Sequence, residues 1–200
     1  MFSIFSQFNQ KHMPVAAAGF GIIELLVSIS IMVVISGVIL VQQSSFNGAV
    51  LLRSQAYEVA LDAREVQLNA VSINDVTGDF RSLLGLHFDL DNNQAYNIFR
   101  DADNDGYYDQ AEMFGKQGAL DDRFEIREIR VNRNSGGVMS VAQLSVVFER
   151  PNFDARFFSQ TGEIDASGIE IDVAKNDVPS GSSDPIRTIE ITSTGQIAVQ

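Results

Sequence analysis

The densest run of residues able to do chemistry is an acidic segment, residues 101–112, which reads DADNDGYYDQAE. It matches the calcium-loop pattern D-x-[DN]-x-[DN]-G-x5-E at every specified position. Calcium takes about six to eight hard oxygen ligands from a sharply turned loop, and the glycine permits the turn. The pattern predicts oxygen ligands from Asp101, Asp103, Asp105, the Tyr107 backbone carbonyl, Asp109 acting through water, and Glu112 with both oxygens.

The residues that flank this loop do not form the helix pair of an EF-hand. Ala95–Phe99, before the loop, alternates as a strand does, and Gly115 follows soon after it. We therefore expect Ca²⁺ to staple a domain that has no cysteine, rather than to switch a pair of helices. The sequence leaves open a solvated acidic turn with no bound ion.

Charge and composition exclude several classes of function. The 200 residues include 26 acidic and 14 basic ones, for a net charge of −12. No nucleic-acid partner is predicted, because phosphate backbones are held by clustered Lys and Arg. Cysteine is absent and only two histidines occur, so thiolate sites and cysteine nucleophiles are excluded. No nucleophile elbow or phosphate-binding loop is present either, and we expect a protein that is not an enzyme, with His87 an ordinary sheet residue.

The chain that positions the acidic loop begins, near its N-terminus, with a long apolar segment. Residues 20–41 read FGIIELLVSISIMVVISGVILV, with Glu24 as their one charge. As a helix they would span roughly 30 Å, which is the thickness of a bilayer core. They predict a transmembrane segment at about 20–42. A buried core helix is the alternative.

The helical pattern continues past this segment without a proline, as far as Ile73. Apolar residues recur at spacings of three, four and seven, and charged residues occupy the positions between them. We predict one helix over 20–73, whose first half lies in lipid and whose second half packs on a globular domain. The apolar positions are Leu51, Leu52, Ala56, Val59, Ala60, Val66 and Val71.

From residue 74 the periodicity changes towards two, with frequent Gly, Asn and Asp at turns. The predicted fold class is α+β: the long N-terminal helix packs on a C-terminal antiparallel β-sheet domain, 74–200, with one sheet face covered by the helix. The predicted strands are Gly85–Leu90, Ala95–Arg100, Phe124–Val131, Val138–Glu149, Ala155–Phe158, Ile169–Val173, Ile186–Thr192 and Gln196–Val199. The segment Val178–Pro185 is predicted to be a flexible surface loop.

The order of segments at the N-terminus is unusual. A secretory signal peptide has its apolar region first and its small-residue cleavage site afterwards. Here the small residues Ala16–Gly19 come before the apolar run. Cleavage after Gly19 would remove a leader, 1–19, and keep the apolar helix.

The sequence GFGIIELL, which begins at Gly19, resembles the prepilin processing motif of the type IV pilin and pseudopilin family. The resemblance implies that a prepilin peptidase cleaves between Gly19 and Phe20 and N-methylates Phe20, and that Glu24 is the family's acid at the fifth mature position. Gly21 departs from the Thr or Ser that is usual there. The end of the chain, Arg187–Val199, more loosely resembles the closing strands of GspH/FimT-like minor pilins.

Glu24 is costly in hydrocarbon unless it is paired or protonated. The resemblance implies that it pairs with the α-amino group of Phe20 on a neighbouring subunit and so sets the register of a growing filament. A residue that snorkels to the membrane face is the alternative.

The resemblance implies a structural subunit of a type IV pilus or pilus-like filament. Its partners would be the prepilin peptidase, other pilin subunits, inner-membrane assembly machinery and, before assembly, membrane lipid. The leader would be cytoplasmic and the β-rich domain extracytoplasmic, and the filament extracellular or periplasmic. Two alternatives stay open: a pseudopilin of a type II secretion or competence system, and a membrane-anchored calcium-dependent binding module that does not polymerise.

This processing can be tested directly. The mature protein is expected to begin at Phe20 and to carry an N-methyl group, as read by intact mass and N-terminal analysis. A start after a small residue beyond the apolar run, with the helix lost, would instead indicate ordinary secretion.

Overall fold

The computed structural model describes residues 21–71, 83–149, 152–176 and 185–200, and within the helix the side chains of 41–46 lie outside the description. The predicted leader, the Gly19–Phe20 cleavage site and most of the predicted loop at 178–185 also lie outside the described residues. The chain divides into two compact units, Met1–Ser45 and Phe46–Gln200. We call the second unit the head.

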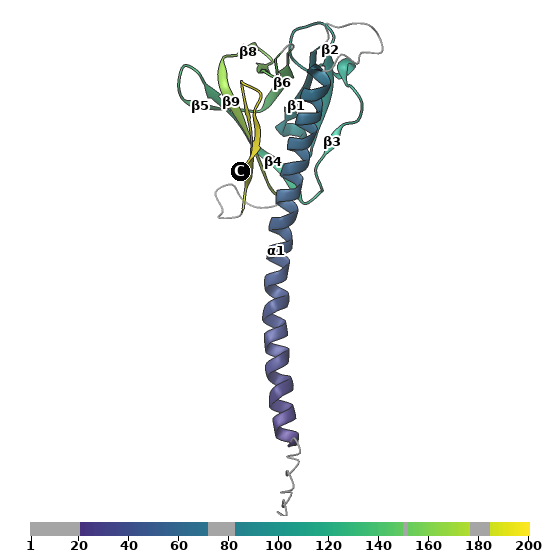
Figure 1. Cartoon of the computed structure of the whole chain (residues 1–200), viewed down its shortest axis with the longest axis vertical. Helices are drawn as coiled ribbons and strands as arrows, with labels where there is room; N and C mark the ends of the chain where they lie inside the picture. The colour runs from purple at the N-terminus through teal and green to yellow at the C-terminus, as the bar shows by residue number, and fades with distance from the viewer. Residues whose placement is uncertain (1–20, 72–82, 150–151, 177–184) are drawn as a thin grey trace, which may run out of the picture. The chain divides into compact units, whose positions relative to one another are not determined.

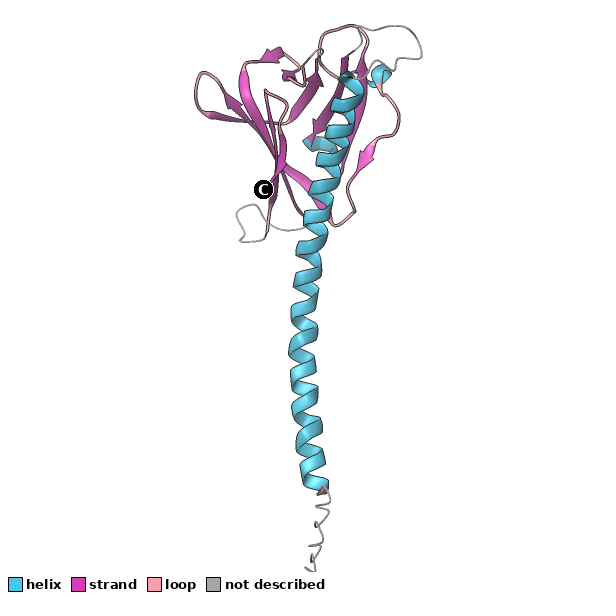
Figure 2. Ribbon diagram, viewed as in Figure 1, coloured by secondary structure: helices cyan, strands magenta, loops and turns pink. Residues whose placement is uncertain are grey.

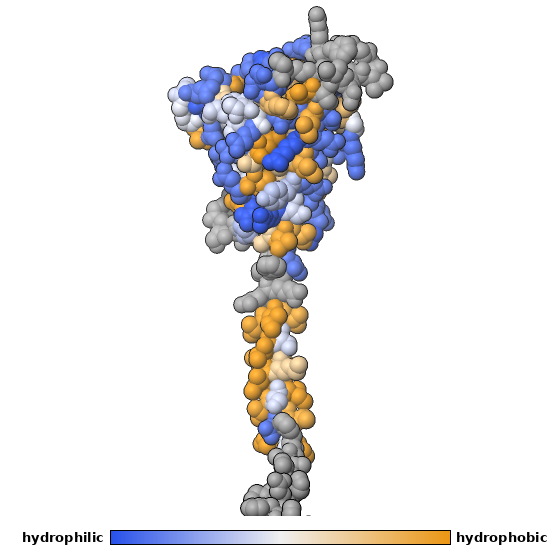
Figure 3. Space-filling model, in the orientation of Figure 1, coloured by the Kyte–Doolittle hydropathy of each residue, from blue (hydrophilic) through white to orange (hydrophobic). Residues whose placement is uncertain are grey.

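A single helix, α1 (Ile22–Val71), has residues in both units. Its bounds confirm the predicted helix over the part of the chain that is described. In the first unit, Ile22–Leu40 is long and apolar enough to cross a membrane, and its side chains are exposed. The hydroxyl groups of Ser28 and Ser30 donate to the carbonyls of Glu24 and Leu26, both at 2.8 Å. These bonds satisfy the two hydroxyl groups within the helix itself, which suits an apolar surrounding. Figure 3 shows this segment as a mostly hydrophobic surface.

Within the head, one face of α1 is buried against the strands (Figures 1 and 2). Small residues dominate that face, so the helix backbone approaches the sheets closely. The buried residues recur at helical spacing and are Leu52, Ala56, Val59, Ala60, Ala63, Val66 and Ala70.

The head contains two antiparallel sheets. The six-stranded sheet has the order β3-β2-β1-β6-β7-β8, and the five-stranded sheet has the order β11-β10-β9-β4-β5. In the first, the strands are β1 (Leu83–Asp89), β2 (Ala95–Asp101), β3 (Gly118–Ala119), β6 (Gln143–Phe148), β7 (Ala155–Ser159) and β8 (Gly162–Ile164). In the second, they are β4 (Phe124–Arg133), β5 (Val138–Val141), β9 (Ala166–Lys175), β10 (Arg187–Thr192) and β11 (Ile197–Val199). Two short 3-10 helices, η1 (Leu90–Asn92) and η2 (Gln110–Glu112), follow β1 and precede β3.

The prediction of a single sheet was therefore wrong, and so was the prediction of one strand over Val138–Glu149. That segment breaks at Ala142: β5 pairs with β4 in one sheet, while β6 pairs with β1 and β7 in the other. The two parts differ in burial. Residues 138–141 are exposed or half-buried, whereas 144–148 are buried on both faces. The strands β3 and β8 were missed because two or three residues are too few to show a period.

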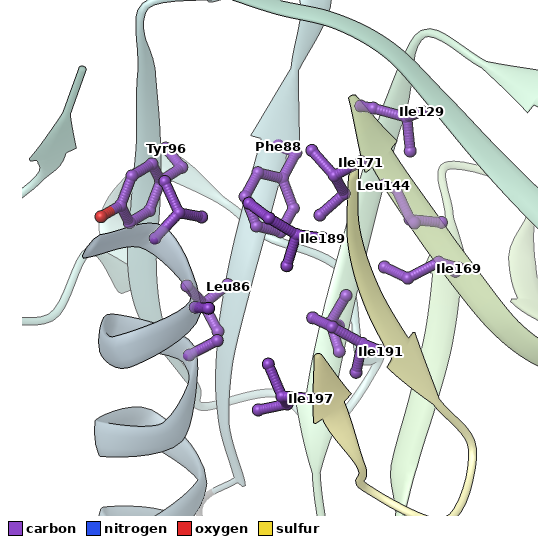
Figure 4. Packing of buried hydrophobic residues seen from close by; sticks show 14 of the residues in the cluster. Leu86, Phe88, Tyr96, Ile129, Leu144, Ile169, Ile171, Ile189, Ile191 and Ile197 are labelled. Carbon is purple, nitrogen blue, oxygen red and sulfur yellow. The ribbon is translucent and has the colours of Figure 1, made fainter. Parts of the chain in front are cut away.

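The main core lies between the two sheets and the buried face of α1. Figure 4 shows Leu86 and Phe88 of β1 beside the helix and facing isoleucines of the five-stranded sheet, among them Ile189 and Ile191. The α+β class is confirmed, but the helix closes a two-sheet core instead of covering one sheet.

Close packing of α1 on the sheets makes a prediction about Ala63, which is fully buried. Ala63→Leu should lower the free energy of unfolding by about 1–3 kcal/mol, because extra methylene groups overfill a packed core. Ser54→Leu places the same side chain on the exposed side of the helix and should change it by less than about 0.5 kcal/mol. Denaturant unfolding of the full chain in detergent measures both, and equal effects would contradict the packing.

Candidate metal centre

The acidic loop joins the end of β2 to η2. Asp101 is the last residue of β2, and Glu112 is the last residue of η2. Asp101 is fully buried, whereas Asp103 and Asp105 are exposed. The six-stranded sheet therefore fixes the first residue of the loop, and the rest of the loop turns back over that sheet.

The Asp101 carboxylate organises the turn. Its Oδ1 accepts a hydrogen bond from the backbone N–H of Asn104 at 2.7 Å, and its Oδ2 accepts one from Gly106 at 3.0 Å. Burial raises the pKa of Asp101, although these two hydrogen bonds lower it, and the nearby Glu112 and Asp103 carboxylates raise it further. The charged form of Asp101 is thus held in an unfavourable, desolvated place.

Three of the predicted ligands come together. One carboxylate oxygen from each of Asp101, Asp103 and Asp105 lies within 4.8 Å of the others. Asp103 and Asp105 are oriented by the backbone N–H groups two residues ahead, at 3.2 Å and 2.7 Å. All three are hard oxygen donors, which is the ligand type that calcium prefers.

Glu112 closes the loop through hydrogen bonds. Its Oε1 accepts from the backbone N–H of Ala102 at 2.8 Å, and its Oε2 accepts from that of Asp109 at 3.2 Å. Neither Asp109 nor Glu112 belongs to the group whose oxygens lie within 4.8 Å. Glu112 therefore holds the two ends of the loop together, but neither its carboxylate nor that of Asp109 joins the three clustered carboxylates.

Two features of the loop require a glycine at position 106, the backbone conformation and the closeness of Phe158. Its φ of +79° lies in the left-handed region, and a Cβ at this position would lie 2.4 Å from a ring carbon of Phe158. Only glycine meets both conditions without strain. At Gly106, the sixth residue of the pattern, the loop backbone therefore packs directly against the Phe158 ring of β7.

Comparisons with known proteins were made for the whole chain. No family model, curated protein or solved structure matches it at a significant level.

Sequence reasoning missed the polar support beneath the loop. His87 does lie in β1, but it is buried, with its Nδ1 2.9 Å from the Ser145 hydroxyl oxygen. That oxygen also accepts from the backbone N–H of Tyr108 at 3.1 Å. The Tyr107 hydroxyl donates to Gln143 at 2.8 Å. The loop is thus bonded to β6 at two points.

The rings of this support are packed together as well. The His87 ring stacks on Tyr108 at 5.0 Å and meets the edge of Tyr107 at 5.2 Å. Burial lowers the pKa of His87 to about 4, so this ring is neutral near pH 7. The signal in the sequence was the alternation of Gln143 and Ser145 with apolar residues, next to two adjacent tyrosines in the loop.

A second, smaller apolar cluster lies under the same loop. It consists of Phe99, Val147 and Phe158, with Leu83 and Tyr108 packed against it. These side chains leave the six-stranded sheet on the face opposite the main core, because neighbouring residues in a strand point to opposite faces. The loop covers that face, which explains why β6 is buried on both sides.

The predicted assembly residue lies elsewhere. Glu24 is exposed in the first turn of α1, and its backbone N–H donates to the carbonyl of Gly21 at 3.0 Å. The cleavage site itself is outside the described residues.

Proposed function

We propose that this chain is a structural subunit of a type IV pilus or pilus-like filament, processed by a prepilin peptidase and assembled through α1. The observation that carries the proposal is the helix itself. An apolar, exposed segment, Ile22–Leu40, belongs to the same unbroken helix that supplies one wall of the head's core.

An exposed apolar segment of this length must be covered by lipid or by protein. Lipid suits a subunit that waits in the membrane, and the same segments of other copies suit a filament. A transfer from one to the other exchanges one apolar surrounding for another, so the hydrophobic effect does not oppose it.

Glu24 separates this proposal from a simple anchored module. It is the one charged residue of the apolar segment, and a carboxylate there costs at least a few kcal/mol unless it is paired. The amino group created by cleavage before Phe20 would lie one helical turn away along the chain, so a neighbouring copy shifted by about one turn can present it to Glu24. A membrane-anchored module that does not polymerise does not require Glu24 to pair with the amino group of a neighbouring copy. A secretion or competence pseudopilin would use the same residues in a shorter filament.

We also propose that the acidic loop binds calcium and staples the head. Asp101, Asp103 and Asp105 supply the clustered oxygens, and Tyr107, Asp109 and Glu112 are the further ligands that the pattern assigns. A divalent cation would offset the repulsion among these carboxylates and the desolvation of Asp101. It would also tie the loop to the end of β2, where Asp101 lies, in a chain that has no cysteine.

The assembly proposal predicts the effect of Glu24→Ala. The variant should insert and be cleaved normally, but its incorporation into filaments should fall by at least about ten-fold, because the buried amine loses its partner. Immunoblots of sheared filament fractions, with the membrane fraction beside them, measure this. Ser30→Ala is the matched control, since the Ser30 hydroxyl bonds only to its own helix. Glu24→Ala subunits that assemble at wild-type levels would exclude the pairing.

The calcium proposal predicts a change in melting temperature. At about 100 times its dissociation constant, calcium should raise the melting temperature of the full chain in detergent by roughly 5–10 °C. Magnesium should do less, because its smaller octahedral shell fits this loop poorly. Asp101→Ala or Glu112→Ala should remove the difference, while Asp91→Ala, at an exposed acid outside the loop, should keep it. Identical melting curves with calcium and with chelator would reduce the loop to a solvated turn.

A further inference from the structure

The helix α1 carries a second apolar surface within the head, on the side away from the core. Val50, Tyr57, Leu61 and Leu68 have exposed fractions of 52%, 48%, 64% and 59%. Their spacings of seven, four and seven residues place them along one side of the helix, each within about 20° of a common line at 100° per residue. We call them the outer stripe. In the space-filling view, hydrophobic surface lies over α1 in the head, with hydrophilic surface beside it (Figure 3).

The two sides of the outer stripe carry opposite charge. Arg53 borders it on one side, and Glu58 and Glu65 border it on the other. The Arg53 guanidinium lies 5.5 Å above the Tyr57 ring, at the edge of the stripe. Among the described residues, no ion pair neutralises Arg53, Glu58 or Glu65. Arg64 follows Tyr57 by seven residues and so falls on the stripe itself, and its guanidinium donates to the carbonyl of Ile197 at 2.8 Å.

The acidic side opens onto a groove of about 400 Å³ between α1 and the segment 114–119. Glu58, Asp62 and Glu65 line it from the helix, and Lys116 lines it from the opposite wall. The Asp62 carboxylate is engaged, since it accepts a hydrogen bond from the Tyr96 hydroxyl at 2.5 Å. Glu58 accepts a hydrogen bond from Gln55 at 2.9 Å, and both Glu58 and Glu65 are exposed to a cation supplied from outside the chain.

The charges beside the outer stripe favour parallel over antiparallel packing of two such helices. In coiled-coil positions, the outer stripe occupies a and d, Arg53 occupies g, and Glu58 and Glu65 occupy e. When two such helices pack in parallel, position g of one faces position e of the other, five residues further along. When they pack antiparallel, g faces g and e faces e. Parallel packing therefore opposes Arg53 to Glu58, whereas antiparallel packing opposes like charges.

We propose that the outer stripe and its charged borders form a contact between two copies of this chain, with their α1 helices parallel and Arg53 of one copy paired with Glu58 or Glu65 of the next. The proposal rests on the proposed function for its occupant, a second copy. Glu65 follows Glu58 by one heptad, so a shift of about 10 Å along the helix keeps the charges complementary. Copies inserted in one membrane by the same apolar segment share one direction, as the pairing requires.

Disulfide trapping tests this contact in the full chain, because the protein has no cysteine of its own. Two differently tagged chains, one with Arg53→Cys and one with Glu58→Cys or Glu65→Cys, are made together and oxidised in membranes. Disulfides between the two different chains should exceed those between identical chains by at least about three-fold. An excess of Arg53→Cys pairs, equal yields of all pairs, or no disulfide would each overturn the proposal.

Charge reversal gives a second measurement that does not depend on cysteine. Arg53→Glu should lower filament incorporation by about two- to five-fold or more, as expected for the loss of an exposed ion pair that becomes a repulsion. Arg53→Glu combined with Glu58→Arg and Glu65→Arg should restore it. If Glu24→Ala blocks assembly but Arg53→Glu does not, the contact fails and the filament proposal stands. If the disulfides form as expected in cells that contain the prepilin peptidase and the assembly machinery but this chain enters no filament, the contact stands and the filament proposal fails.

Discussion

The exposed apolar surface of α1 is the constraint on which the rest of the structure depends. A helix of 50 residues begins with an exposed segment that is long and apolar enough to cross a membrane and ends as one wall of a folded core. Lipid and neighbouring copies are the two coverings that require no change in the helix, and the filament proposal uses both in succession.

The head meets this constraint with two sheets and a buried helix face built mainly from alanines. Small side chains let the helix lie close to β1 and to the five-stranded sheet, and the opposite side of α1 carries the outer stripe. The second apolar cluster, under the acidic loop, covers the far face of the six-stranded sheet. Calcium at this loop would strengthen a layer that is otherwise held by one buried carboxylate, two tyrosines and His87.

The sequence predicted the long helix, the α+β class and most strand centres, because each of these has a period that extends over several residues. It did not predict two sheets. The break at Ala142 carries no glycine or proline, and it is visible only in the change from a half-buried strand to one buried on both faces. The acidic pattern predicted that Asp101, Asp103 and Asp105 cluster, since its spacing is local, but Asp109 and Glu112 lie outside that cluster. It did not predict the contacts of His87 with Ser145, which are 58 residues apart in the chain and meet only through strand pairing.

The central claim is that α1 covers its apolar segment with the same segment of other copies. Helical reconstruction of filaments that contain this chain, by electron cryomicroscopy, tests it most directly. We expect parallel α1 helices at the centre of the filament, with Glu24 of one copy within ion-pair distance of the Phe20 amino group of the next. Filaments with α1 on the outside, or with Glu24 facing lipid or solvent, would contradict it.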